Sequence, residues 1–187
     1  MACDIANGRL EVCKDAVGGI DAIYFINYGD YSYPTDITYV TGTDTIDTIA
    51  NVSSLYKYEL KGTNSFDQVI TSSRENGTSF VEQTLTVTLK KQDAATHKNV
   101  KLLSYGRPNI VIKNRNNQFF LAGLEHGMEL TTANVTNGVA MGDLNGYTLT
   151  FQGTEKLLAN LLDASSEADL VGQAGDVFGV STTIVTA

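Results

Sequence analysis

The chain has 187 residues, 42% of them hydrophobic and 18% charged, so it can form the core of a single domain. Its 21 acidic and 13 basic residues give a net charge of −8, which argues against sequence-independent binding to DNA or RNA. The N-terminus lacks a basic stretch followed by an apolar run, and no run approaches the roughly 18 apolar residues of a membrane span. We therefore expect a protein that is made and kept in a cytoplasm or released by lysis. We also expect its two cysteines, Cys3 and Cys13, to be reduced.

Alternation with a period of two, the period of a β-strand, dominates the chain. In chain order, strand-like runs occur at Ile20–Ile26, Ile37–Val40, Tyr56–Leu60, Phe66–Thr71, Thr84–Leu89, Ile110–Ile112, Phe119–Leu124 and Tyr147–Phe151. The clearest is Thr84–Leu89, where leucine and valine alternate strictly with threonine. One face of that strand is therefore predicted to be apolar and the other polar.

Turn-forming residues separate several of these runs. Asn76-Gly77 precedes the strand that contains residues 84–89, and this pair permits the positive φ angles of a tight hairpin. Arg115-Asn116-Asn117 predicts a second hairpin, and Asn145-Gly146 predicts a third turn. Hairpins between sequential neighbours indicate an antiparallel meander.

Two segments have helical patterns. The first runs from Ala94 to about Tyr105, with Asp93 as its N-cap and Gly106 and Pro108 after its end. The second runs from Glu155 to Leu162, with Thr154 as its cap and leucines at i, i+3 and i+4 spacing. The second is too short to be stable without tertiary contacts.

Two stretches are long for loops of a compact monomer. Residues 28–54 hold four Asp, several Thr and only short strand-like pieces, and five of the nine tyrosines lie between Tyr24 and Tyr39. Loops longer than about 12–15 residues are usually functional or disordered, and tyrosines are favoured in protein contacts. Residues 165–187 resemble an arm that ends in one strand. No linker or internal repeat divides the chain, so one domain over residues 1–187 is predicted.

No constellation of residues designates a catalytic, cofactor-binding or metal site. The two histidines, His97 and His126, are isolated, whereas a metal site or a Ser-His-Asp triad needs convergent partners. The acidic residues fall mostly in predicted turns, although a glycosidase pair could be hidden among them. The segment Gly142–Gly146 lacks the ligand spacing and closing glutamate of a calcium loop, so we predict a turn there. We expect no enzyme activity and no cofactor.

Four blocks in order carry a resemblance to a known family. They are Ser79–Leu89, Tyr105–Ile112, Phe119–Leu130 and Gly142–Glu155. Together they resemble the tail tube (major tail) proteins of tailed bacteriophages, over about Phe66 to Leu162. The resemblance implies an all-β fold with minor α, either an antiparallel β-sandwich or a partly closed barrel flanked by one main helix. It also implies a structural virion protein, assembled in the host cytoplasm, whose copies form stacked hexameric rings.

In such a tube the partners would be further copies of the chain and other tail proteins, with no membrane involved, and genomic DNA would pass through without specific binding. We predict that a loop over about residues 28–54 contacts the neighbouring ring through Tyr28, Tyr31, Tyr33 and Tyr39. We predict that Glu82, Thr84, Thr86 and Thr88 face the lumen. The alternatives are another virion component, such as a capsid decoration or head–tail completion protein, and a carbohydrate-binding β-sandwich module. A hydrolase of unfamiliar type is a third.

Overall fold

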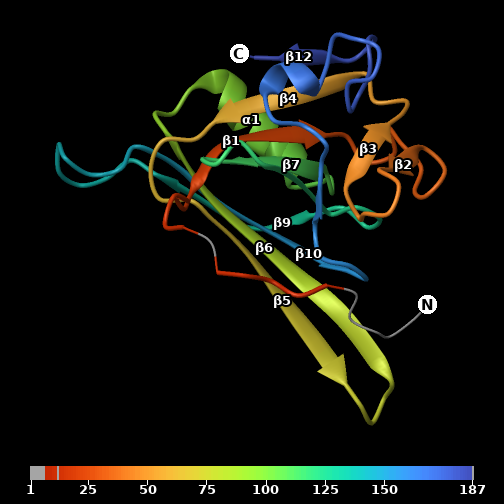
Figure 1. Cartoon of the computed structure of the whole chain (residues 1–187). Helices are drawn as coiled ribbons and strands as arrows, with labels where there is room; N and C mark the ends of the chain where they lie inside the picture. Colours follow the sequence, from red (N-terminus) through yellow and green to blue (C-terminus); the bar gives the residue numbers. More distant parts are fainter. Residues whose placement is uncertain (1–6, 12, 187) are drawn as a thin grey trace.

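The computed structural model describes residues 7–11 and 13–186, and the fold that it gives is mainly β, as predicted (Figure 1). Cys3 lies outside the described residues, and Cys13 is exposed. The strands are β1 Ile20–Ile26, β2 Ile37–Tyr39, β3 Ile46–Ile49, β4 Ser54–Glu59, β5 Ser65–Ser73, β6 Thr78–Lys90, β7 Asn109–Asn114, β8 Phe119–Ala122, β9 Glu129–Thr136, β10 Gly146–Glu155, β11 Asn160–Leu161 and β12 Thr183–Val185. The helices are α1, Ala94–Leu103, and a short 3-10 helix η1, Glu167–Asp169. Among the described residues, no helix is long and apolar enough to cross a membrane.

The strands form two main sheets and one small one. The six-stranded sheet has the order β11-β8-β7-β1-β4-β12, and the four-stranded sheet has the order β5-β6-β10-β9. Strands β2 and β3 pair separately. The predicted meander is therefore wrong as a description of the whole fold, because β6 pairs with β10 and β1 with β7, which are not sequential neighbours. The predicted hairpins are local units that the long-range pairings combine.

The six-stranded sheet is covered on both faces because the central strand β1 is apolar at nearly every position. Ile23 and Phe25 point into a core shared with the four-stranded sheet and α1. Tyr24 and Ile26 point the other way, into a second core. Strands that are buried on both faces have continuous apolar runs rather than alternation. The architecture is thus a β-sandwich with a third, partial layer.

Residues from the two long stretches build that third layer. Ile46 and Ile49 of β3 are buried in the second core, beside Leu170 and Phe178 from the C-terminal stretch. The Ile49 amide donates a hydrogen bond to the Val177 carbonyl oxygen at 2.6 Å. Residues 28–54, which we expected to be a long loop, thus form part of the subunit's own core. The C-terminal stretch ends in one strand as expected, but it packs against the body.

Helix α1 follows its sequence signals closely. Asp93 is the N-cap, and its Oδ1 accepts a hydrogen bond from the Thr96 amide at 2.8 Å. The helix ends at Leu103, and Val100 is buried against the sheets. This end is two residues earlier than predicted, as is common for helix termini.

The predicted second helix is wrong. Residues up to Glu155 continue β10, which pairs with β6 as far as Val81, and β11 begins at Asn160. The Ala159 amide donates to Oε1 of Gln68 at 2.7 Å. The leucine spacing in this region is helical, but a short helix has little stability of its own, and pairing with a long neighbouring strand outweighs it.

Candidate functional site

The outer face of the four-stranded sheet carries the polar residues that the alternation in residues 84–89 predicted. On β6, Leu85 and Val87 are completely buried, so the residues between them point outward. Thr84, Thr86 and Glu82 therefore share one face of the sheet, together with Thr88. The structure confirms the predicted alternation of an apolar and a polar face along this strand. A shift of the pairing by one residue would exchange the two faces.

The neighbouring strands extend this polar face. Residues directly opposite each other in an antiparallel pair lie on the same face. The pairings therefore add Ser65, Asp67 and Thr71 from β5, Thr148, Thr150, Gln152 and Thr154 from β10, and Glu129, Thr132, Asn134 and Thr136 from β9. Val69 and Phe80, at the hairpin end, are its apolar members. The outer face is therefore polar across all four strands, and most of its side chains carry hydroxyl groups.

Acidic residues outnumber basic ones on this face. Asp67, Glu82 and Glu129 lie on it, against Lys90 at the end of β6. Thr84, Thr86 and Thr88 are half-buried because each has a neighbour on both adjacent strands or a loop beside it, whereas Glu82 is exposed. The surface is therefore mildly acidic and otherwise uncharged.

Both edges of this sheet are open. Strands β5 and β9 are the outermost strands, and neither pairs with a further strand among the described residues. The hairpin of β5 and β6 also continues past Val81, the last residue that β10 pairs with, to the Asn76-Gly77 turn. Figure 1 shows this hairpin projecting well beyond the body. Open edges and a projecting hairpin are features that proteins usually cover, by pairing or by other means.

The four predicted interface tyrosines differ in their surroundings. Tyr28 and Tyr39 expose 43% and 36% of their surface, and Tyr33 is half-buried. Tyr31 is buried, and its hydroxyl donates to the Leu124 carbonyl oxygen at 2.7 Å. Burial raises the pKa of the Tyr31 phenol well above its ordinary value. Tyr31 therefore stabilises the subunit itself, and Tyr28, Tyr33 and Tyr39 remain available to a neighbour.

A small cavity of about 400 Å³ lies beside three of these tyrosines, Tyr28, Tyr31 and Tyr33. The Arg107 guanidinium lies 4.0 Å from the centre of the Tyr28 ring and covers one of its faces. Tyrosine rings bind sugars by stacking, which needs a free face. Arg107 thus reduces the stacking surface that this cavity could offer to a carbohydrate.

One group of side chains could hold a metal ion by its composition. Donor atoms of Glu125, His126 and Glu155 lie within 4.8 Å of one another. However, Oε1 of Glu155 already accepts hydrogen bonds from the Glu125 and His126 amides, at 3.0 and 2.7 Å. Glu125 pairs with Lys156 at 2.9 Å, which lowers the pKa of its carboxyl. The group fits a structural role, in which a buried carboxylate anchors a turn.

Two glycines make that turn possible. Gly123 and Gly127 have φ angles of +69° and +75°, and a Cβ atom on Gly123 would lie 2.7 Å from the Gly127 carbonyl carbon. The turn that carries His126 therefore needs glycine at both ends. The other histidine, His97, lies on α1 with its ring 6.2 Å from that of Tyr147.

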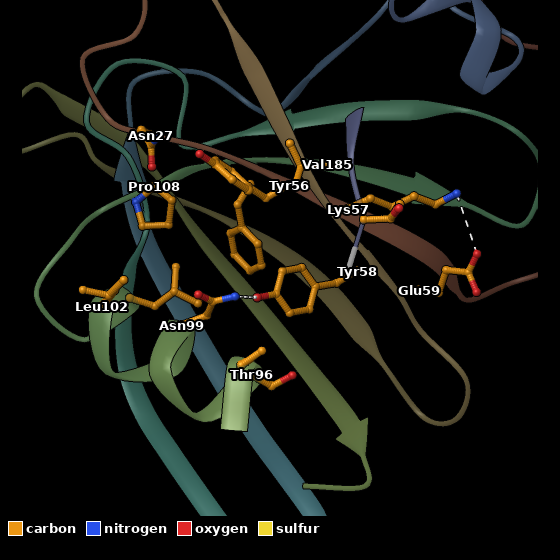
Figure 2. Close-up of a pocket in the computed structure, with 14 residues that line it drawn as sticks. Asn27, Tyr56, Lys57, Tyr58, Glu59, Thr96, Asn99, Leu102, Pro108 and Val185 are labelled. Carbon is orange, nitrogen blue, oxygen red and sulfur yellow. Dashed lines mark hydrogen bonds and ion pairs between the residues drawn. The ribbon is translucent and has the colours of Figure 1, made fainter. Parts of the chain in front are cut away.

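Sequence reasoning missed a groove of about 840 Å³ between α1 and the β4–β12 edge of the larger sheet. Figure 2 shows Tyr56 and Tyr58 of β4 facing Leu102 and Asn99 of α1 across it, with Val185 of β12 at one side. These residues are far apart in sequence. Leu102 of α1 lines this groove and is exposed.

Comparisons of the chain with protein-family models, with curated proteins and with solved structures find no match.

Proposed function

We propose that this chain is the tail tube subunit of a tailed bacteriophage, a structural protein that assembles with copies of itself into stacked rings. The observation that carries the proposal is the four-stranded sheet. Its inner face packs into the subunit core, its outer face is polar, and neither of its edge strands pairs with another described strand. A monomer has no need of all three features at once, whereas the wall of a hollow tube needs each of them.

The polar face suits a surface along which DNA slides. Threonine hydroxyls contact water well but carry no charge, so they offer phosphates no ionic attraction. The acidic residues Asp67, Glu82 and Glu129 add a weak repulsion. At physiological salt, charges are screened beyond about 8 Å, so the residues of the wall itself dominate what passing DNA encounters. Glu82, Thr84, Thr86 and Thr88 are proposed to line that wall.

The open edges provide a way to close the tube. Pairing β5 of one copy with β9 of the next would continue the sheet from subunit to subunit. These two edges are different surfaces, so the contact is head-to-tail, and such contacts form rings when the rotation closes. A closed ring of sheets removes every exposed edge, which is how barrels avoid aggregation. Hexameric rings are the expected closure.

Tyr39 remains our candidate for contact between rings, together with Tyr28 and Tyr33. A deletion within residues 28–54 would be a poor test, because Ile37, Ile46 and Ile49 in that segment are buried. The substitution Tyr39→Ser removes a ring that is 36% exposed, and it leaves the buried isoleucines of the segment in place. It should leave a folded subunit that polymerises weakly, and Tyr39→Phe, which keeps the ring, should polymerise well. Equal polymerisation of Tyr39→Ser and wild type would contradict this role.

The direct test is negative-stain electron microscopy of the purified protein, with its mass measured by light scattering over a range of concentrations. Hollow tubes or rings with a stain-filled centre are the expected result. A protein that stays monomeric at every concentration and forms neither rings nor tubes would refute the proposal. A monomer that binds a glycan would favour the carbohydrate module, and one that binds only to capsids would favour a decoration protein.

A further inference from the structure

A carboxylate lies buried between the turn of residues 123–127 and the end of β10, with one of its oxygens unpaired. Glu155 is only 4% exposed, and its Oε1 accepts hydrogen bonds from the Glu125 and His126 amides. Among the described residues, Oε2 accepts no hydrogen bond, and Glu155 forms no ion pair. An ionised carboxylate has about four lone-pair sites, so this one has capacity for a further partner.

The charge of this carboxylate is not balanced by its two hydrogen bonds. Burial raises the pKa of the Glu155 carboxyl, because the charged form loses its hydration. Buried charges in proteins are usually paired with an opposite charge or bound to a metal ion. The two amides hold the turn in place but carry no net positive charge. A cation beside Glu155 would supply that charge.

Two further donors converge on the same carboxylate. One donor atom from each of Glu125, His126 and Glu155 lies within 4.8 Å of the other two. Three atoms at that spacing all lie within about 2.8 Å of a common point, and zinc binds oxygen and nitrogen ligands at about 2.0–2.2 Å. His126 is exposed and Glu125 is half-buried, so small rotations of these two side chains can close the difference.

The donor set favours a transition metal over magnesium or calcium. Two carboxylates and one imidazole combine oxygen donors with a nitrogen donor, whereas magnesium and calcium prefer oxygen alone. Three protein ligands leave the fourth position of a tetrahedral zinc site open. Glu125 and His126 also line the cavity of about 400 Å³ beside Tyr28 and Tyr31, so solvent or a fourth ligand can reach that position.

A competing cation already contacts one of the three ligands. Nζ of Lys156 lies 3.1 and 2.9 Å from the two carboxylate oxygens of Glu125, and the Lys156 side chain is 72% exposed. Exposed ion pairs of this kind contribute little to stability, because water solvates both charges well. A divalent cation can therefore replace the ammonium group at Glu125 and leave Lys156 in solvent.

We propose that Glu125, His126 and Glu155 form a binding site for a divalent transition metal ion, for which Zn²⁺ is the probe. The ion joins the turn of residues 123–127 to the end of β10 through side chains, in addition to the two amides. His126 and Glu155 are 29 residues apart, so their convergence depends on the fold and gives no signal in the sequence. The site lies within one subunit and does not depend on self-assembly.

Titration with zinc by isothermal calorimetry tests the site. The protein carries Cys3→Ser and Cys13→Ser, because thiolates bind zinc themselves, and it carries no histidine tag. One Zn²⁺ per chain is expected. His126→Ala should weaken binding by at least about tenfold, since even the loss of an outer partner of a metal ligand costs about 10- to 100-fold. His97→Ala is the matched control, because His97 is exposed on α1 and outside the group, and it should bind like wild type.

A second variant keeps all three ligands and removes the competing cation. Lys156→Met should tighten zinc binding by about two- to fivefold, which corresponds to the strength of an exposed ion pair. Lys101→Met is the control, because it removes the same charge from an exposed position on α1 outside the group, and it should leave the affinity unchanged.

A third measurement needs no substitution at the ligands. In ¹⁵N NMR spectra of the histidine rings, addition of Zn²⁺ should shift the ring nitrogens of His126 and leave those of His97 in place. This readout reports a metal bond at the imidazole, which a purely structural role of the turn would not produce.

Several outcomes would refute the site. They are equal zinc affinity of the wild type and His126→Ala, equal losses in the two histidine variants, no zinc binding by the wild type, and no tightening in Lys156→Met. An unshifted His126 ring in the presence of bound zinc would also refute it. None of these results affects the tube proposal, because the measurements concern the subunit, whereas electron microscopy tests the assembly.

Discussion

Placing lysines on the polar sheet face should make the assembled protein bind DNA. The perturbation is Thr84→Lys with Thr86→Lys, at two half-buried positions on the outer face of β6. Position 84 lies opposite Asp67 on β5, so one new lysine gains an acidic cross-strand neighbour. Neither position contributes to the buried core, so the subunit should fold and assemble as before.

The magnitude follows from the release of counterions. Each phosphate that a lysine neutralises steepens the dependence of log K on log salt by about 0.9. For one added contact, affinity should then fall about 3.5-fold between roughly 50 and 200 mM salt, and for both lysines of a subunit about 12-fold. Wild-type tubes should bind weakly at every salt concentration, because the face carries more acidic than basic residues.

Co-sedimentation of tubes with a fluorescent duplex, over a series of salt concentrations, measures this effect. A matched variant, Gln173→Lys with Ser181→Lys, adds the same two charges on the exposed C-terminal stretch. That variant should bind no better than wild type to DNA that enters the tube. If the two lysine variants bind DNA equally, or if lysines at positions 84 and 86 block assembly, the polar face does not line the lumen.

Three further predictions concern the subunit itself. Leu85→Ala removes a completely buried side chain and should lower the free energy of unfolding by about 2–5 kcal/mol in urea, whereas Thr86→Ala on the opposite face should lower it far less. Burial raises the pKa of the Glu155 carboxyl above its ordinary 4.5, so the unfolded chain releases this proton at lower pH than the folded one. Wild-type stability relative to Glu155→Gln should therefore fall as pH rises from about 4.5 through the folded pKa, and a rising or constant difference would contradict this. Gly123→Ala should greatly reduce the yield of folded protein, while Gly142→Ala, where a Cβ meets open space, should not.

Local signals in the sequence were enough for several elements. The alternation of residues 84–89 fixed which side chains share a face, because the strand period is two wherever the strand lies. The Asn76-Gly77 turn and the Asp93 cap were also predictable, since both depend on residues adjacent in sequence. These features need no knowledge of distant partners.

Other features were decided only by contacts between distant residues. The segment after Glu155 has a helical leucine pattern. However, pairing with β6 keeps the chain in strand β10 as far as Glu155, and the Ala159 amide donates a hydrogen bond to Oε1 of Gln68. Tyr28 and Tyr31 look alike in the sequence, but the Leu124 carbonyl, 93 residues away, holds Tyr31 inside the fold. A sequence pattern can separate polar from apolar side chains. Which of them the core covers depends on which strands pair and on what packs over them.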